Sequence, residues 1–367
     1  MEEHPLEILG EALKDAVAEM DVHCTDCGAC SVRCAFLKEK GTPGRIAEMV
    51  RTLPCEEWPD PFHCSLCGLC GAICPEGLRP EKLFLAMRRE LVRRGRLGLK
   101  PYKPILFYES VGDSELFSFF RLPQGGDTVL FPGCALPSTR PATVRRLFET
   151  LEEIVPSLGV ALGCCIKPSF DLGREDFFRE RFGALRDKLL AAGVRRVITA
   201  CPNCQKVFAE SGGPLESVTA YALLDEAGYA PKVNGGPPVV VHDACPQRHD
   251  EATRRGVRAL AERCAVVVER TPAEGLLTRC CGEGGMVGFV RPDLAQTWTD
   301  AREKTVAGKR VLTSCAGCAN YLGRRMEAVH ILDVVFGTGG KRPLRPPLTY
   351  GARLLLKRWF KRRFGKG

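Results

Sequence analysis

The chain has 367 residues, 20 cysteines and an apolar fraction of 45%, enough for two or three domains with buried cores. The formal net charge of +9 belongs to residues 341–367, which carry ten lysines and arginines and no acid, so the other 340 residues sum to −1. A body without net positive charge argues against a nucleic-acid-binding protein.

The beginning of the sequence, Met1-Glu2-Glu3-His4-Pro5, is acidic, and no apolar segment of the secretory type follows it. No apolar run approaches the ~18 residues that a membrane span needs. We therefore expect a cytoplasmic protein whose thiols stay reduced. In such a compartment this many cysteines indicate metal or cluster ligation rather than disulfides.

Two cysteine runs, 40 residues apart, lie between amphipathic helices predicted over 6–20 and 80–94. Each run has three cysteines spaced three apart and a fourth after three more residues. Such runs are typical of two-cluster ferredoxins, in which the fourth cysteine ligates the other cluster. We therefore assign Cys24, Cys27, Cys30 and Cys74 to one 4Fe–4S cubane, and Cys64, Cys67, Cys70 and Cys34 to the other.

The alternative for these runs is a pair of structural zinc sites. Zinc ligands usually come as separated C-x2-C pairs, and a duplicated triplet of cysteines fits that pattern poorly. We therefore interpret residues 1–110 as a helical ferredoxin-type domain. Nothing in it suggests a substrate site, so we expect it to carry electrons.

From about residue 126 the sequence predicts alternating strands and helices. Short apolar runs predict buried strands over 128–131, 197–199, 239–241, 266–268 and 311–313, and helical spacing appears over 141–155, 175–192, 251–263 and 294–307. Such alternation is typical of an α/β fold with mostly parallel sheets. Gly235-Gly236-Pro237-Pro238 suggests a boundary between one α/β domain over 126–236 and another over 237–338.

A second cysteine repeat indicates that this α/β part is duplicated. Each copy has one cysteine, then a cysteine pair, then C-x-x-C; the copies are Cys134, Cys164, Cys165, Cys201 and Cys204, and Cys245, Cys280, Cys281, Cys315 and Cys318. Four of these cysteines follow predicted strands, where ligands collect in α/β sheets. With the ferredoxin runs, they leave only Cys55 and Cys264, which we interpret as ordinary thiols.

The two copies resemble the cysteine-rich, or CCG, domains of heterodisulfide reductase and of the iron–sulfur subunits of glycerol-3-phosphate and glycolate dehydrogenases. The resembling residues are Phe131-Pro132-Gly133-Cys134, Gly163-Cys164-Cys165, Cys201-Pro202-Asn203-Cys204, His242-Asp243-Ala244-Cys245-Pro246, Cys280-Cys281-Gly282-Glu283-Gly284-Gly285 and Ser314-Cys315-Ala316-Gly317-Cys318. Together with the ferredoxin runs, this order is similar to the D subunits of heterodisulfide reductases. The resemblance implies a non-cubane 4Fe–4S cluster at each five-cysteine set, able to cleave a disulfide.

One residue departs from the family pattern. Ile166 follows the first cysteine pair, where the family has glycine and the second copy has Gly282. Glycine permits close approach of the backbone, so we expect isoleucine to crowd the first site. One or two further clusters are therefore expected, and a zinc or empty site in the first copy is the alternative.

The chain lacks a phosphate-binding loop, a strand-linked G-x-G-x-x-G and a C-x-x-C-H haem motif. With no flavin or nicotinamide site, it must exchange electrons with a partner, such as a dehydrogenase, a flavoprotein or a membrane cytochrome or quinone subunit. In the basic tail, 341–367, one helical face carries Ala352, Leu355, Leu356, Trp359, Phe360 and Phe364. A basic amphipathic helix predicts contact with the inner membrane surface or with a membrane-bound partner.

Two functions remain open on the sequence. The first is a heterodisulfide-reductase-like oxidoreductase, in which electrons cross the cubanes to a CCG cluster that cleaves a disulfide. The second is an electron-transfer subunit that links a dehydrogenase to a membrane quinone carrier, without a substrate of its own. A zinc scaffold is a third, non-redox alternative. We place the chemistry at the second CCG site.

Overall fold

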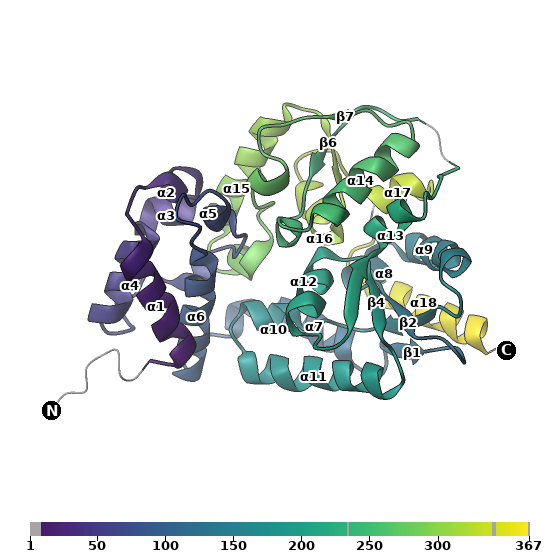
Figure 1. Ribbon diagram of the computed structural model, residues 1–367, viewed down its shortest axis with the longest axis horizontal. Helices are drawn as coiled ribbons and strands as arrows, with labels where there is room; N and C mark the ends of the chain where they lie inside the picture. The colour runs from purple at the N-terminus through teal and green to yellow at the C-terminus, as the bar shows by residue number, and fades with distance from the viewer. Residues whose placement is uncertain (1–8, 233–234, 340–342, 366–367) are drawn as a thin grey trace.

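The computed structural model describes residues 9–232, 235–339 and 343–365 and has a helical N-terminal module, two α/β units and a last helix (Figure 1). The module lies at one end of the molecule, against both α/β units. Its elements are α1 (Glu11–His23), α2 (Ala29–Arg33), α3 (Ala35–Lys40), α4 (Pro43–Thr52), η1 (Pro61–His63), α5 (Leu69–Ala72), α6 (Pro80–Arg93), η2 (Lys100–Tyr102) and α7 (Lys103–Asp113).

Helix α1 buries the apolar stripe that the sequence predicts, including Leu13, Val17 and Met20. Its bounds differ from the predicted 6–20, because it begins at Glu11 and continues to His23, and residues 1–8 lie outside the described residues. Helix α6 begins at Pro80, whose fixed φ suits a first helical position, and nearly matches the predicted 80–94.

The first α/β unit contains a five-stranded sheet in the order β1-β3-β2-β4-β5. All neighbours pair in parallel except β1, which is antiparallel at one edge. The elements are β1 (Phe119–Arg121), β2 (Thr128–Phe131), α8 (Ala135–Thr139), α9 (Pro141–Ile154), β3 (Gly159–Leu162), α10 (Lys167–Asp171), α11 (Glu175–Ala191), β4 (Arg196–Thr199), α12 (Pro202–Ser211), β5 (Glu216–Thr219) and α13 (Ala220–Glu226).

The second unit repeats this topology without the extra edge strand. Its sheet is wholly parallel, in the order β7-β6-β8-β9. The elements are β6 (Val239–His242), η3 (Cys245–Gln247), α14 (Glu251–Arg263), β7 (Val268–Glu269), η4 (Gly275–Leu277), η5 (Gly284–Phe289), α15 (Pro292–Val306), β8 (Arg310–Thr313), α16 (Ala316–Leu322), β9 (Ala328–His330) and α17 (Ile331–Val335). The α/β fold with mostly parallel sheets is thus confirmed; among the predicted strands, 266–268 is the poorest match, since β7 begins only at Val268.

The two α/β units share one buried core. Leu147 and Val160 of the first unit and Leu260 and Leu312 of the second belong to the same apolar cluster. Tyr221 adds a polar link, because its hydroxyl donates toward the carbonyl oxygens of Ala200 and Ser314 at 2.9 and 2.8 Å. This shared core holds the two sets of strand ends in a fixed relation.

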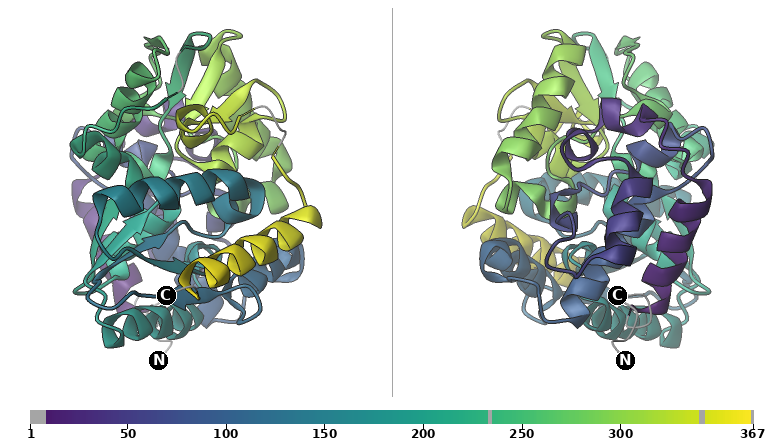
Figure 2. Two further views of the ribbon diagram at one scale, coloured as in Figure 1. Left: turned by 90° about the vertical axis from the view of Figure 1, so that its right-hand side faces the viewer. Right: turned by 90° about the vertical axis from the view of Figure 1, so that its left-hand side faces the viewer.

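Helix α18 (Leu348–Phe364) corrects the interpretation of the basic tail. Its apolar face is not free for a membrane or a partner, because it packs on the first α/β unit, and Leu356 and Phe360 are fully buried. Phe360 meets Phe148 of α9 edge to face at 5.0 Å and stacks on Phe119 of β1. Figure 2 (left) shows α18 lying across this unit. Only Leu355 of the apolar face is well exposed, at 57%.

No helix in the described part of the chain is both long enough and apolar enough to span a bilayer.

Candidate metal centres

Five cysteines of the N-terminal module line one cavity, and they come from both runs. Cys24, Cys27 and Cys30 line it from the first run, and Cys70 and Cys74 from the second. Gly44 lets α4 come close, because a Cβ there would lie 3.2 Å from the sulfur of Cys24. Burial raises the pKa of the Cys24 and Cys30 thiols, so thiolates at this site need a cation beside them.

The second cavity is lined by Cys34, Cys64, Cys67 and Cys70. Each fourth cysteine thus lines the cavity of the other run, and Cys70 lines both cavities. The crossed ligand sets stay a prediction. The backbone repeats as well: Asp26 and Leu66 have φ of 51° and 53°, and Gly28 and Gly68 have 73° and 69°. Burial raises the pKa of the Cys34 thiol to about 12, and that of Cys64 well above its usual range. Bound iron would hold such thiols deprotonated.

The first CCG centre gathers the five predicted cysteines in the first α/β unit. Cys134 follows β2, Cys201 precedes α12, and the sulfurs of Cys204 and Cys165 lie 3.4 Å apart. A hydrogen bond from Cys164 lowers the pKa of Cys134, and one from Cys204 lowers that of Cys201. These thiols lie close enough to hydrogen-bond to one another in pairs, and together they form a set of sulfur donors that fits a metal cluster.

Ile166 is accommodated beside this centre rather than excluded from it. Its φ is 56°, the left-handed conformation that usually requires glycine, and its side chain is buried among the apolar residues of the first unit. The equivalent Gly282 of the second unit could not be replaced so easily, because a Cβ there would lie 2.5 Å from Thr299 Oγ1. The sequence identified the unusual backbone position but not the room around the isoleucine.

The second CCG centre gathers the other five predicted cysteines in the same order. Cys245 follows β6, Cys315 precedes α16, and the backbone N–H of Cys318 donates to the sulfur of Cys315 at 3.4 Å. Hydrogen bonds from Cys245 and Cys281 hold the pKa of Cys280 well below its usual range. Both five-cysteine sets therefore form compact sulfur clusters.

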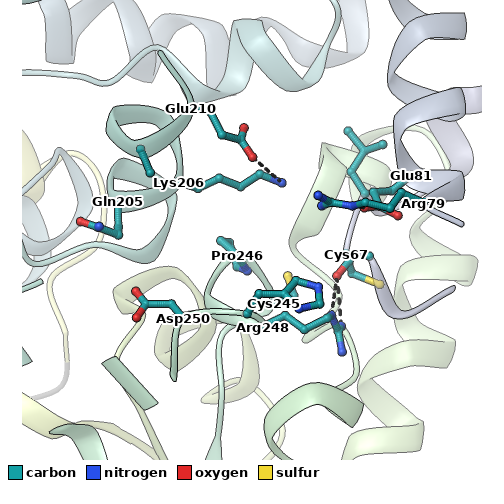
Figure 3. A pocket seen from close by; sticks show the side chains of 14 residues that line it. Cys67, Arg79, Glu81, Gln205, Lys206, Glu210, Cys245, Pro246, Arg248 and Asp250 are labelled. Carbon is teal, nitrogen blue, oxygen red and sulfur yellow. Dashed lines mark hydrogen bonds and ion pairs between the residues drawn. The ribbon is translucent and has the colours of Figure 1, made fainter. Parts of the chain in front are cut away.

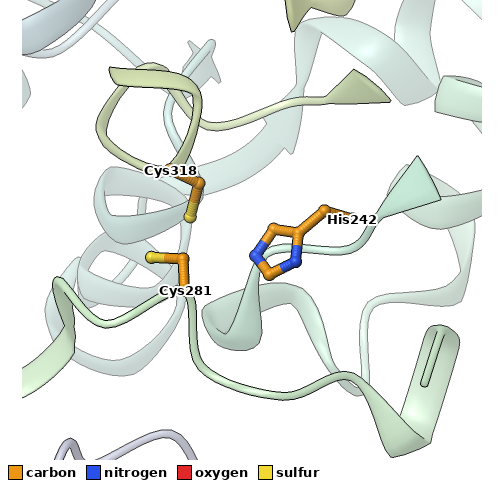
Figure 4. Close-up of side chains that lie close together, drawn as sticks. All are labelled: His242, Cys281 and Cys318. Carbon is orange, nitrogen blue, oxygen red and sulfur yellow. The ribbon is translucent and has the colours of Figure 1, made fainter. Parts of the chain in front are cut away.

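His242 is a member of this second centre that the sequence did not assign. A ring nitrogen of His242 and the sulfurs of Cys281 and Cys318 all lie within 4.8 Å of one another (Figure 4). Burial lowers the pKa of His242 to about 3, so the imidazole is neutral. The only sequence signal was its place in the second repeat, where the first has Phe131.

The second ferredoxin cavity abuts the second CCG centre. Cys280 and Trp298 line that cavity together with the module's cysteines. The Gly284-Gly285 backbone packs directly on the second run, since a Cβ on Gly285 would lie 2.5 Å from the carbonyl oxygen of Cys64. The close approach of the two sites therefore depends on glycine at this contact.

Two buried arginines stabilise the contact between the ferredoxin module and the α/β units. Arg88 donates hydrogen bonds to the carbonyl oxygens of Cys64 at 2.6 Å, Asp171 at 2.6 Å and Gly285 at 3.1 Å, and so joins the module to both α/β units. Arg248, close to Cys245, donates from Nη2 to the carbonyl oxygen of Cys67 at 3.0 Å. Sequence reasoning missed both residues, because their partners are backbone oxygens far away in the chain.

A cleft of about 300 Å³ opens where the module and the two α/β units meet. Cys67 lines it from the module, Lys206 from α12, and Cys245 from the second unit (Figure 3). Its charged side chains are largely paired: Arg79 with Glu81 at 2.8 Å, and Lys206 with Glu210 at 3.9 Å. The cleft thus gives a polar ligand access to the junction between a ferredoxin cavity and a CCG centre.

The two leftover cysteines lie outside the four sets. Cys264 is fully buried in the shared core, as an ordinary apolar side chain would be. Cys55 is partly exposed, and its thiol donates toward Glu56 at 3.4 Å.

Comparison with known proteins agrees with these sites. Residues 22–78 match the 4Fe-4S dicluster domain, and residues 128–209 and 239–323 each match the cysteine-rich CCG domain. The chain is 24% identical to the D subunit of the dihydromethanophenazine:CoB–CoM heterodisulfide reductase from Methanosarcina barkeri, over 75% of each chain. It is 23% identical to the B subunit of the fumarate reductase (CoM/CoB) from Methanothermobacter marburgensis, over 85% of this chain and 58% of that protein.

Proposed function

From its 4Fe–4S dicluster domain and two CCG domains, the chain is an iron–sulfur electron-transfer protein related to heterodisulfide reductase D subunits, and we propose that it reduces a disulfide at its second CCG centre. In this proposal the two ferredoxin sets hold 4Fe–4S cubanes, and the second five-cysteine set holds a further iron–sulfur cluster. Clusters bound there supply one-electron chemistry. The reaction takes two electrons and two protons and converts one disulfide into two thiols.

The main support for this proposal is the cleft between Cys67 and Cys245. A disulfide in the cleft would lie beside both the last carrier of the module and the second CCG centre. The chain's own residues would hold it: Lys206 and His249 offer cationic or hydrogen-bonding groups, and the walls come from three parts of the molecule. The first CCG centre, which lies away from Cys67, would then assist the second centre.

Electrons would enter at the opposite end of the module. Cys27 of the first ferredoxin set is exposed, whereas Cys64 and Cys70 of the second are buried. An exposed set suits exchange with a redox partner, and the relatives named above are themselves subunits of reductases. The direction of travel would be from the first set to the second and then to the CCG centre.

Anaerobic purification with iron and sulfide counting, followed by EPR, tests the proposal. Adding a thiol or a disulfide to the oxidised protein should generate a new paramagnetic signal, which Cys245→Ser should remove. Cys264→Ser is the matched control, because that cysteine is buried outside every set. A spectrum of ordinary cubanes alone would favour the relay between a dehydrogenase and a quinone carrier, and zinc in place of iron would refute both functions.

A further inference from the structure

His242 is buried against the second CCG centre with one side of its ring unsatisfied. Its side chain is 1% exposed, and Nδ1 has no hydrogen-bond partner among the described residues. Figure 4 shows the ring directed from the end of β6 toward the sulfurs of Cys281 and Cys318. The nitrogen nearer these sulfurs in Figure 4 is Nε2, whereas Nδ1 faces the other way. A buried ring nitrogen beside two thiol sulfurs is placed to donate its lone pair to a metal held by them.

The first α/β unit provides an internal comparison. Phe131 ends β2 as His242 ends β6, and each precedes the first cysteine of its set by three residues. The strand register agrees too, because Phe131 pairs with Thr199 and His242 with Thr313. Phe131 is fully buried and packs edge to face on Phe208. The same place in the fold therefore holds an apolar ring in one unit and an imidazole in the other.

We propose that His242 is a nitrogen ligand to the metal of the second CCG centre, which makes that centre a mixed sulfur–nitrogen site and leaves the first with sulfur alone. The inference rests on the proposed function in requiring iron at the second centre. Imidazole and thiolate are both established donors to iron, and the ring nitrogen and the sulfurs of Cys281 and Cys318 all lie within 4.8 Å of one another.

A difference in ligands gives the two centres different roles. Where His242 takes the place of one of the five cysteines on an iron, the exchange of thiolate for neutral imidazole makes the centre less negative and raises its reduction potential. The second centre would then accept electrons more readily than the first. This agrees with its position beside Cys67, where electrons leave the ferredoxin module.

Nitrogen hyperfine spectroscopy tests the ligand directly. The full-length protein, labelled with ¹⁵N-histidine and brought anaerobically to the paramagnetic state of the second centre, should show a strongly coupled nitrogen by pulsed EPR. The coupling should be lost in His242→Phe, which copies the first unit, and kept in His249→Gln, whose side chain is exposed in the cleft. His242→Gln is a second variant if the phenylalanine disturbs folding.

The measurement on the unmodified protein needs no variant. Iron present at the second centre without strong nitrogen coupling would overturn the ligand assignment and leave the proposed function standing. Absence of iron from the second centre, measured by metal counting against the Cys245→Ser protein, would overturn the proposed function itself.

Discussion

Arg353 of the last helix donates a hydrogen bond from Nη2 to the carbonyl oxygen of Gly112, at the end of α7, at 3.2 Å. Gly112 stands between that guanidinium and the first CCG centre: a Cβ on it would lie 3.1 Å from Arg353 Nη1 and 3.3 Å from the Cβ of Cys164. The buried positive charge of Arg353 helps to lower the pKa of Cys134, after the hydrogen bond from Cys164. The last helix thus contributes a charge beside the first candidate metal centre.

Arg353→Gln should make the first centre harder to reduce. Removing a buried positive charge near the sulfurs favours the oxidised, less negative state by about 2 kcal/mol at the effective dielectric of proteins. A redox titration followed by EPR measures the shift. Arg358→Gln is the control, since Arg358 lies exposed on the same helix. Equal potentials in the two variants would contradict the role of Arg353.

Arg248→Gln should slow electron transfer from the module to the second centre. The substitution removes charge-assisted hydrogen bonds to the Cys67 carbonyl, each worth about 1.5–3 kcal/mol, and so loosens the junction. Stopped-flow reduction should show normal reduction of the cubanes and delayed reduction of the CCG centre. If iron content is kept and both phases are unchanged, the junction does not depend on this arginine.

Serine substitutions should distinguish crossed from uncrossed cubanes. In the crossed arrangement, Cys74→Ser impairs the same cluster as Cys24→Ser, and Cys34→Ser the same cluster as Cys64→Ser. Each variant should lose up to about four irons, the content of one cubane. Cys55→Ser should lose none. EPR signals that grouped Cys74 with Cys64 instead would refute the crossing.

Leu356→Ala in α18 should destabilise the protein by about 3 kcal/mol, because the side chain is fully buried against the first α/β unit. Leu355→Ala, one residue away and 57% exposed, should change stability by no more than about 0.5 kcal/mol. The thermal unfolding midpoint of the metal-loaded protein measures both. Equal midpoints would mean that α18 is not docked in solution.

Gly282→Ala should damage the second CCG centre. The glycine has a φ of 106°, and a Cβ would lie 2.5 Å from Thr299 Oγ1 and 2.6 Å from Tyr321 Cε1. Gly193→Ala is a matched control, because Gly193 also has a positive φ, 86°, but nothing lies within 4 Å of its added Cβ. Backbone strain of about 1–2 kcal/mol is common to both, so a loss of iron confined to Gly282→Ala reports the steric contact.

The sequence by itself determined that this is an iron–sulfur protein. The spacing of Cys24, Cys27 and Cys30, repeated 40 residues later, and the paired five-cysteine sets predict iron–sulfur ligands because metal ligation depends on residue type and local spacing. Apolar runs such as 128–131 predicted central strands because buried parallel strands are continuously apolar. Four of the described strands were missed. The residues of β1, β5 and β9 are largely half-buried and leave a weaker pattern, whereas β3 is a buried run of only four residues that begins with glycine.

Only the tertiary structure decided how these parts meet. The contacts that matter join residues far apart in the chain. Leu356 and Phe360 dock on the first α/β unit, and Arg353 approaches Cys134. Arg248 bonds to the carbonyl oxygen of Cys67, and His242 lies beside Cys281. Such contacts leave no local pattern in the sequence. An amphipathic helix has the same residues whether it packs on a membrane or on its own domain, and a histidine is the same residue whether or not it lies beside a metal. The alternation of basic and apolar residues over 348–364 predicted a helix with two faces, and packing decided that the apolar face is covered.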